Sequence, residues 1–265
     1  MLLDLHTHTY RSFDAFSSDF DILNRCIDLG IEAIAITEHD LPCQVDKSLF
    51  EAHGIELIPG CEYTDNNGAH IIGLYVSDPL PIGYTARKII NHIKSQDGLV
   101  IMPHPWKPDS GFMASTCSHE LLPFFDFIEL INGGWDSSEF HNDIVTLAKK
   151  YNLRMISSSD SHKSHHVGLC CTQIDNHNIL DNARDILRSC KQSDIQLLIN
   201  ESVFRKGHKS LSVKIKKLYL YQKILQVIPY SVRRFIKRIF YKLSFSTMSN
   251  SPTSYKKYSI ALKND

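Results

Sequence analysis

Histidines and carboxylates gather in short clusters along the first two thirds of the chain. His6 and His8 flank one threonine in DLHTHT, and His39 stands between two acidic residues in TEHD. A β-strand turns residues i and i+2 to the same side, so His6 and His8 can hold one ion together. Imidazole and carboxylate groups form a mixed N/O ligand set that suits Mn, Fe or Zn rather than Ca. The clusters therefore indicate a site for divalent metal ions.

Short apolar runs precede most of these clusters and predict the strands that would position them. The expected strands cover 2–6, 32–37, 56–60, 70–76, 99–102, 127–131 and 153–157. Stretches with a period near 3.6 residues, at 21–29, 85–93 and 141–151, predict helices between strands. Repeated strand-then-helix order predicts a parallel sheet, and about seven such units favour closure into a barrel.

A parallel barrel keeps its chemistry at the carboxyl ends of its strands, and the polar clusters agree with this rule. His70 is an exception, because it opens the fourth apolar run rather than following it. The residues that follow the other runs are His6, His8, His39, Glu62, His104, Asp160 and His162. Such side chains are rarely buried without a partner, and a shared cation would partner all of them.

The ordered set of motifs resembles the PHP family, the polymerase and histidinol phosphatase domain. The motifs are DLHTHT at 4–9, TEHD at 37–40, GCE at 60–62, PHP at 103–105 and SSDSH at 158–162, in the family's order. The resemblance implies an α/β fold, a distorted (β/α)7 TIM-like barrel with two or three divalent metal ions per chain. It also implies hydrolysis of a phosphoester by a hydroxide that bridges two metal ions. The implied metal ligands are His6, His8, Asp14, His39, Glu62, His70, His104, Asp160 and His162.

The resemblance also implies individual roles. Glu62 would bridge two ions, Asp160 would join the ion of His6 and His8, and His162 would bind an outer ion with Asp14 and His39. The residues expected to carry catalysis are His104, Asp160 and His162.

Basic residues near the motifs are candidates for binding the substrate. Lys107 follows His104 by three residues and would reach a phosphate oxygen, with a solvated loop lysine as the alternative. Arg11 and His166 are further candidates, and a surface position is the alternative for His166. Glu38 and Asp40 flank His39 and would orient the ligand histidines.

Charge is distributed unevenly along the chain. Residues 1–201 hold 14 of the 29 Lys and Arg and 28 of the 29 Asp and Glu, so they carry a net charge of −14 and the last 64 residues carry +14. We therefore expect a PHP domain at 1–204, a basic amphipathic helical extension at 205–243 and a disordered tail at 244–265.

The extension contains VRRFIKRIFYKL at 232–243, with apolar and basic residues on opposite faces of a helix. Three partners fit this pattern. The helix would pack on the acidic barrel, or residues 230–243 would lie on an anionic membrane, or the basic face would contact nucleic acid. No stretch approaches the roughly 20 apolar residues that span a bilayer.

The seven cysteines predict free thiols in a reducing cytoplasm, and adjacent Cys170 and Cys171 predict small buried residues of a strand. The start of the sequence shows no signal-peptide pattern, so a cytoplasmic protein is expected, with association at the inner face of the membrane as a variant. The expected function is hydrolysis of a small phosphomonoester or a nucleotide phosphate. The alternatives are a non-catalytic PHP scaffold that binds metal or phosphate and docks through the basic tail, or a phosphodiesterase or exonuclease that acts on nucleic acid.

Overall fold

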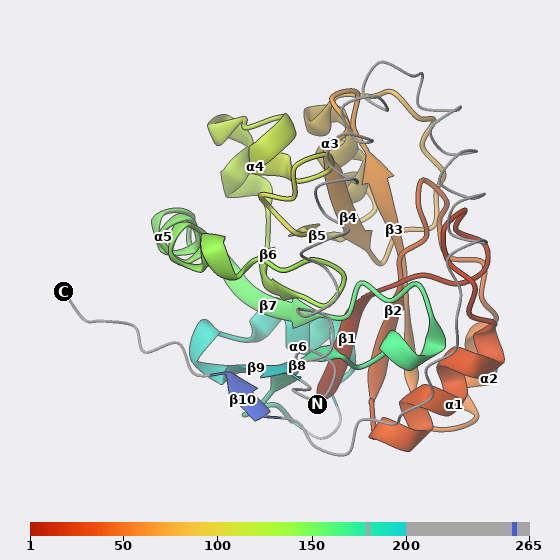
Figure 1. Cartoon of the computed structure of the whole chain (residues 1–265). Coiled ribbons are helices and arrows are strands. Elements are labelled where there is room, and N and C mark those ends of the chain that lie inside the picture. The colour runs from red at the N-terminus through yellow and green to blue at the C-terminus, as the bar shows by residue number, and fades with distance from the viewer. Residues whose placement is uncertain (179–180, 200–255, 259–265) are drawn as a thin grey trace, which may run out of the picture.

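The computed structural model describes residues 1–178, 181–199 and 256–258. Its strands form one sheet in the order β10-β9-β8-β1-β2-β3-β4-β5-β6-β7, which curls into a nearly closed barrel (Figure 1). The strands are β1 (Leu2–Thr7), β2 (Ala33–Ile36), β3 (Glu56–Thr64), β4 (His70–Leu74), β5 (Leu99–Met102), β6 (Phe127–Asn132), β7 (Arg154–Ser158), β8 (Cys170–Ile174), β9 (Ile195–Ile199) and β10 (Lys256–Tyr258). The expected barrel-like α/β fold is confirmed.

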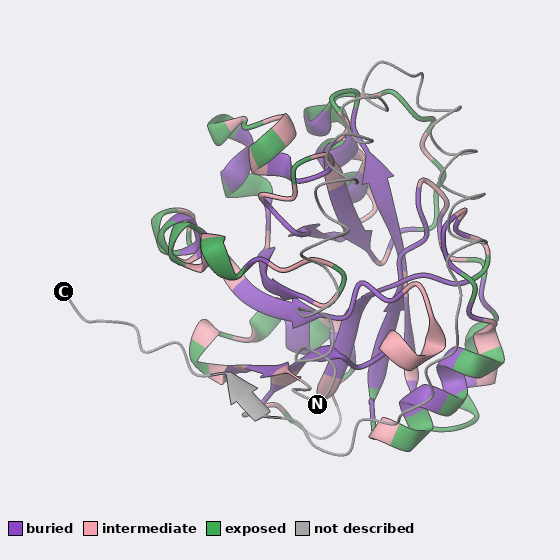
Figure 2. Cartoon of the chain, in the orientation of Figure 1, coloured by how far each residue is buried: buried purple, intermediate pink, exposed green. Residues whose placement is uncertain are grey.

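Helices cover the outside of the barrel. They are α1 (Asp19–Leu29), α2 (Lys47–Glu51), α3 (Ala86–Ser95), α4 (Phe112–Ser115), α5 (His141–Tyr151) and α6 (Ala183–Ser189), with 3-10 turns η1 (His119–Phe124), η2 (Ser138–Phe140), η3 (Ser164–His166) and η4 (Gln192–Asp194). Figure 2 shows buried strands and helices that expose their outer faces. None of the helices in the described ranges combines the length and the hydropathy needed to cross a membrane.

The strand directions correct the expectation of a parallel sheet. The β1–β2–β3 and β5–β6–β7 neighbours are parallel, whereas β4 runs antiparallel to both β3 and β5. The connection 65–69 is too short for the crossover that a parallel pair needs, so β3 and β4 form a hairpin. Its register pairs Thr64 with His70. The start of β4 therefore lies at the same end of the barrel as the carboxyl end of β3, which explains the exceptional place of His70.

Side chains close the barrel between β7 and β8, which the sheet order leaves unpaired. Ser157 N donates to Thr172 Oγ1 over 3.0 Å, and Thr172 Oγ1 donates to Ser157 O over 2.8 Å. The Ser157 hydroxyl also donates to the carbonyl oxygen of Cys171. Cys170 and Cys171 are fully buried on β8, and all seven cysteines are free, as the sequence predicts.

Strand β8 continues antiparallel into β9, and β9 pairs with β10. Because β10 falls within 244–265, the expected disorder of that segment does not hold for Lys256–Tyr258. A tail rich in Ser and Lys still offers main-chain N–H and C=O groups, and these suffice to extend a sheet edge. The basic segment 232–243 lies outside the described residues.

Local signals explain where α1 begins and ends. The Ser18 side chain accepts a hydrogen bond from Asp21 N, and the Asp21 carboxylate accepts one from Ser18 N, which forms a capping box. Gly30 ends the helix in the left-handed region, with φ of 66°. The capping box fixes where the segment that follows β1 enters the helix, and Gly30 fixes where the helix ends.

Asp4, on β1, binds the chain segments on both sides of the gap between β7 and β8, which is the opening of the barrel. Its carboxylate is fully buried and accepts hydrogen bonds of 3.0 Å from Ser159 N and Gly168 N. Burial raises the pKa of Asp4 to about 6, although both donors act in the other direction. We expect Asp4→Ala to lower the free energy of unfolding by about 2–4 kcal/mol, because two buried N–H groups lose their acceptor.

Urea denaturation would measure this loss. Asp28→Ala, at an exposed position of α1, is the control and should change stability by no more than about 0.5 kcal/mol. Equal stability of the two variants would show that Asp4 does not hold the opening together.

Candidate metal centre

All nine residues that the motifs single out meet at one end of the barrel. They come from the ends of β1, β2, β5 and β7, from within β3, from the start of β4 and from the 8–18 loop. The structure places four overlapping groups whose ligand atoms lie within 4.8 Å of one another. These groups are His8/His39/His162, His6/His104/Asp160, His6/His8/Glu62 and His39/Glu62/His70. Each group could hold a metal ion.

Glu62 is the hub of this cluster. Its Oε1 lies 2.8 Å from His70 Nδ1 and 3.2 Å from His104 Nε2. Its Oε2 lies 3.4 Å from Nε2 of both His6 and His8 and 3.1 Å from His39 Nδ1. The two oxygens therefore face two different sets of imidazoles.

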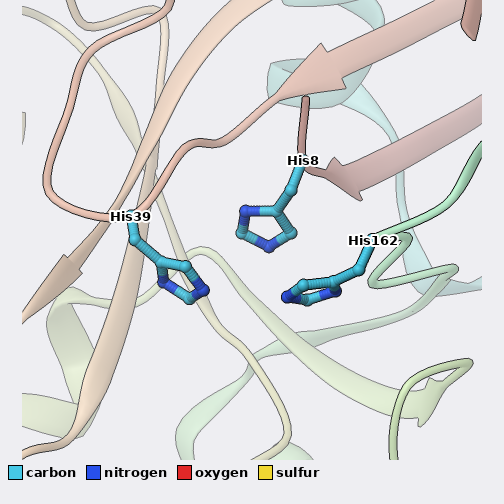
Figure 3. Close-up of side chains that lie close together, drawn as sticks. All are labelled: His8, His39 and His162. Atoms are coloured by element: carbon cyan, nitrogen blue, oxygen red, sulfur yellow. The ribbon is translucent and has the colours of Figure 1, made fainter. Parts of the chain in front are cut away.

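A second carboxylate and an outer group complete the cluster. Asp160 Oδ1 lies 3.4 Å from His6 Nε2, 3.5 Å from His8 Nε2 and 3.6 Å from His162 Nδ1. Asp14 Oδ2 lies 3.4 Å from His39 Nε2 and 3.3 Å from His162 Nε2. Figure 3 shows His8, His39 and His162 pointing toward one another from three separate segments.

The electrostatics divide the histidines into two kinds. Burial lowers the pKa of His8 to about 3, with the charges of His162 and His39 acting in the same direction. Burial also lowers the pKa of His104 to about 4, with a contribution from Lys107. These two imidazoles are therefore neutral, as a metal ligand must be.

The carboxylates dominate at the other positions. Burial by itself would lower the pKa of His39, but Asp14 and Glu62 outweigh it and raise that pKa to about 10. Burial would raise the pKa of Glu62, but the surrounding histidines bring it well below its usual value. Ionised carboxylates so closely packed attract cations strongly.

The donor set fits divalent ions on two further observations. Asp14 Oδ1 and Glu62 Oε2 are buried oxygens that have no hydrogen-bond partner among the described residues. Nε2 of His6 and Nε2 of His8 lie 3.1 Å apart. Two nitrogens that bind one ion at about 2.1 Å lie roughly this far apart. Cations bound within the cluster would satisfy these oxygens and nitrogens.

Glu129 is a member of the site that the sequence analysis missed. It lies in the middle of β6 and its side chain is fully buried. Oε1 lies 2.9 Å from His6 Nδ1 and accepts from the Ser158 hydroxyl, while Oε2 accepts from His104 N and Asn132 Nδ2. Glu129 thereby orients His6 so that Nε2 faces the cluster. A lone acid inside the apolar run FIELIN was the one available signal.

The expected substrate-binding residues take different positions. Lys107 Nζ lies 3.8 Å from Asp160 Oδ2 at the edge of the cluster. The Arg11 guanidinium forms a bidentate pair with Asp19 at 2.5 and 2.9 Å, so it is turned to α1 rather than to the cluster. His166 ends η3, contacts the His165 ring edge-on, and has a pKa that burial lowers to about 4.

The acids beside His39 differ from each other. Asp40 adopts φ of 53°, and its carboxylate accepts from Thr64 N over 2.7 Å, which anchors the end of β3. Glu38 points the other way, into the loop after β1, where it accepts hydrogen bonds from Thr9 and Ser12.

Comparison with known proteins agrees with this architecture. The sequence matches the PHP domain over residues 4–243. MJ1587, an uncharacterized protein of Methanocaldococcus jannaschii, is 35% identical over 120 residues, which cover 41% of this chain and 70% of that protein.

Two solved structures show the same fold. A two-domain protein from Bacteroides vulgatus containing a predicted PHP-like metal-dependent phosphoesterase has a TM-score of 0.57 at 20% identity, covering 74% of this chain and 64% of that chain. The lesion-specific endonuclease PfuEndoQ from Pyrococcus furiosus has a TM-score of 0.51 at 19% identity, covering 72% of this chain and 57% of that chain. The present chain thus spans less than two thirds of either protein.

The sequence match extends over most of the chain, and the barrel brings every matched motif to one end. The chain belongs to the PHP domain family.

Proposed function

We propose that this protein is a metal-dependent phosphoester hydrolase that acts on a small phosphomonoester or a nucleotide phosphate. The observation that carries the proposal is Glu62, a buried carboxylate whose two oxygens face two sets of imidazoles. A carboxylate in that position is suited to holding two ions a few ångströms apart. Such a pair stabilises the attacking and leaving oxygens of a phosphoryl transfer.

The nine candidate ligands can be assigned to individual metal ions. His6, His8 and Asp160 would hold one ion, Glu62 would join it to the next, and His39, Asp14 and His162 would hold an outer one. His70 and His104 complete the set around Oε1 of Glu62. Two or three ions of Mn, Zn or Fe fit these ligands. Bound divalent ions would polarise the phosphate and supply a nucleophile from water near neutral pH.

Lys107 supports a phosphate-binding role at the edge of this centre. Its ammonium lies beside Asp160, and about a quarter of the side chain (27%) is exposed. We expect Lys107→Ala to lower kcat/KM for phosphomonoesters by roughly 10- to 100-fold, because one positive charge facing the phosphate is lost. Steady-state phosphate release would measure this.

Metal content is the companion readout and should stay at the wild-type level in Lys107→Ala. Lys150→Ala, at an exposed position of α5, should leave both quantities unchanged. Unchanged kcat/KM in Lys107→Ala would leave Lys107 as an ordinary loop residue.

The proposed function is tested by metal analysis together with phosphate release. The purified protein would be assayed with phosphomonoesters, nucleotides and a short oligonucleotide, with and without Mn, before and after chelation. We expect two or three ions per chain and turnover that chelation abolishes and Mn restores. Bound metal without turnover on any substrate would instead favour the scaffold hypothesis, against which the full set of ligand types now argues.

The oligonucleotide arm addresses the nucleic-acid hypothesis. The likeness to PfuEndoQ concerns the fold, and the basic segment 205–243 lies outside the described residues. If oligonucleotide cleavage exceeded phosphomonoester turnover and fell steeply with salt, the substrate would be nucleic acid. A lipid-vesicle binding assay would test the membrane interpretation of 230–243.

A further inference from the structure

We infer that Ser12 and Glu38 are positioning residues that orient His8 as a metal ligand through a buried hydrogen-bond relay. This inference rests on the metal centre of the proposed function and adds two residues to it. The relay runs from His8 Nδ1 to the Ser12 hydroxyl and from there to the Glu38 carboxylate. Ser12 is 3% exposed, while Glu38 and His8 are fully buried.

The hydrogen bonds around Ser12 fix the direction of the relay. A serine hydroxyl has one proton to donate and two lone pairs to accept with. Its proton goes to Glu38 Oε2, since an ionised carboxylate only accepts. One lone pair accepts from His39 N over 3.1 Å. The other faces His8 Nδ1 at 3.2 Å, so the His8 ring donates there.

The direction of the relay decides which nitrogen of His8 carries the proton and which keeps a lone pair. With its proton on Nδ1, a neutral imidazole has an unprotonated Nε2. His8 Nε2 lies 3.1 Å from His6 Nε2, 3.4 Å from Glu62 Oε2 and 3.5 Å from Asp160 Oδ1. The relay therefore aims a free lone pair at the place where an ion would be bound.

Thr9 holds the Glu38 carboxylate in the position where it accepts from Ser12. Glu38 Oε1 accepts from Thr9 N over 3.0 Å and from the Thr9 hydroxyl. Thr9 and Ser12, the residues that donate to its carboxylate, both lie in the loop after β1, although Glu38 itself follows β2. Ser12 thus joins two motifs at once, because it accepts from the main chain of His39 and from the side chain of His8.

His6, in the same site, can be compared with His8 by the partner of its Nδ1 atom. Its Nδ1 lies 2.9 Å from Glu129 Oε1, with no residue between them. His6 is therefore oriented directly by a carboxylate, and His8 is oriented by a carboxylate acting through a hydroxyl. Outer partners of this kind typically change metal affinity by roughly 10- to 100-fold when they are removed.

The test measures metal binding by the full-length protein rather than turnover. Zn²⁺ affinity would be determined by competition with a chromogenic chelator for the wild type, Ser12→Ala, Glu38→Gln and Ser12→Thr. We expect Ser12→Ala and Glu38→Gln to weaken the binding of one ion by roughly 10- to 100-fold. Ser12→Thr keeps the hydroxyl and should restore affinity to within about threefold of the wild type.

Two controls separate positioning from folding. Ser17→Ala removes another buried hydroxyl of the same loop, one with no hydrogen-bond partner among the described residues, and should bind Zn²⁺ like the wild type. The visible spectrum of the Co²⁺-loaded protein should change in Ser12→Ala and not in Ser17→Ala, which a general loss of stability would not produce. If Ser12→Ala does not fold, Glu38→Gln carries the test alone.

The outcomes are distinct. Wild-type affinity and an unchanged Co²⁺ spectrum in Ser12→Ala and Glu38→Gln would overturn the relay while leaving the hydrolase proposal intact. A wild-type protein that binds no metal at all would overturn the proposed function as well.

Discussion

Glu62→Gln is expected to lose phosphate release by roughly a thousandfold and to lose at least one bound metal ion. The amide keeps the shape of the side chain but removes the charge, and its NH2 group can no longer serve as a ligand. Because Oε1 and Oε2 face different imidazoles, one substitution disturbs both halves of the cluster. Metal content by elemental analysis and kcat/KM for a phosphomonoester would measure the two losses.

Glu51→Gln is the matched control for this substitution. Glu51 lies on the surface, where it pairs with Lys47, so its loss should change neither quantity. Thermal unfolding in the presence of a chelator would show whether Glu62→Gln is folded. The surrounding histidines hold the pKa of Glu62 well below its usual value, so the metal-free variant is expected to be less stable than the metal-free wild type. Full turnover by Glu62→Gln would remove the bridging carboxylate from the mechanism.

The sequence predicts the barrel because its strands are marked by apolar runs of ordinary length. Seven of these runs coincide with β1 to β7, and the run at 99–102 matches β5 at both ends. The strands outside these seven runs lie after residue 169, where the sequence predicts a strand only at Cys170 and Cys171. Cys170–Ile174 contains polar residues, and Ile195–Ile199 follows a short 3-10 turn rather than a helix, so neither fits a repeating strand-then-helix unit.

The direction of β4 could have been predicted from the turn that precedes it. The sequence DNNG at 65–68 is typical of a hairpin, and in the structure Asp65 Oδ1 accepts from Asn67 N and Ala69 N while Gly68 has φ of 92°. The regular alternation elsewhere in the chain concealed this local signal. With β4 reversed, His70 needs no special explanation.

Most of the candidate ligands could be predicted because they stand in motifs, and Glu38 could be named because it adjoins His39, whereas the other supporting residues could not be predicted. Glu129 is a single acid in an apolar strand, and Ser12 is one of many serines. Ser12 and Glu38 are 26 residues apart and meet only through the path of the loop after β1. Long-range contacts of this kind leave no spacing pattern, so they become visible only in the folded chain.

Asp160→Asn is expected to reduce kcat/KM by roughly a thousandfold while preserving the backbone. Asp160 has φ of 48°, a left-handed conformation that asparagine also tolerates, so the amide is a better test than alanine. The substitution removes the charge that faces His6, His8 and His162 through Oδ1. It also removes the carboxylate partner of Lys107. Without that partner, we expect Lys107 to place a phosphate less precisely against the ions.

Asp97→Asn provides a control of the same chemistry. Asp97 also has a left-handed backbone, with φ of 57°, but it precedes β5, and its carboxylate pairs with Arg184 and Arg188 on the outside of the barrel. We expect this variant to retain kcat/KM within about threefold of the wild type and to retain all bound metal. If Asp160→Asn behaved like Asp97→Asn in both measurements, the ion held by His6 and His8 would not depend on Asp160. The catalytic role would then move to Glu62 and the imidazoles around it.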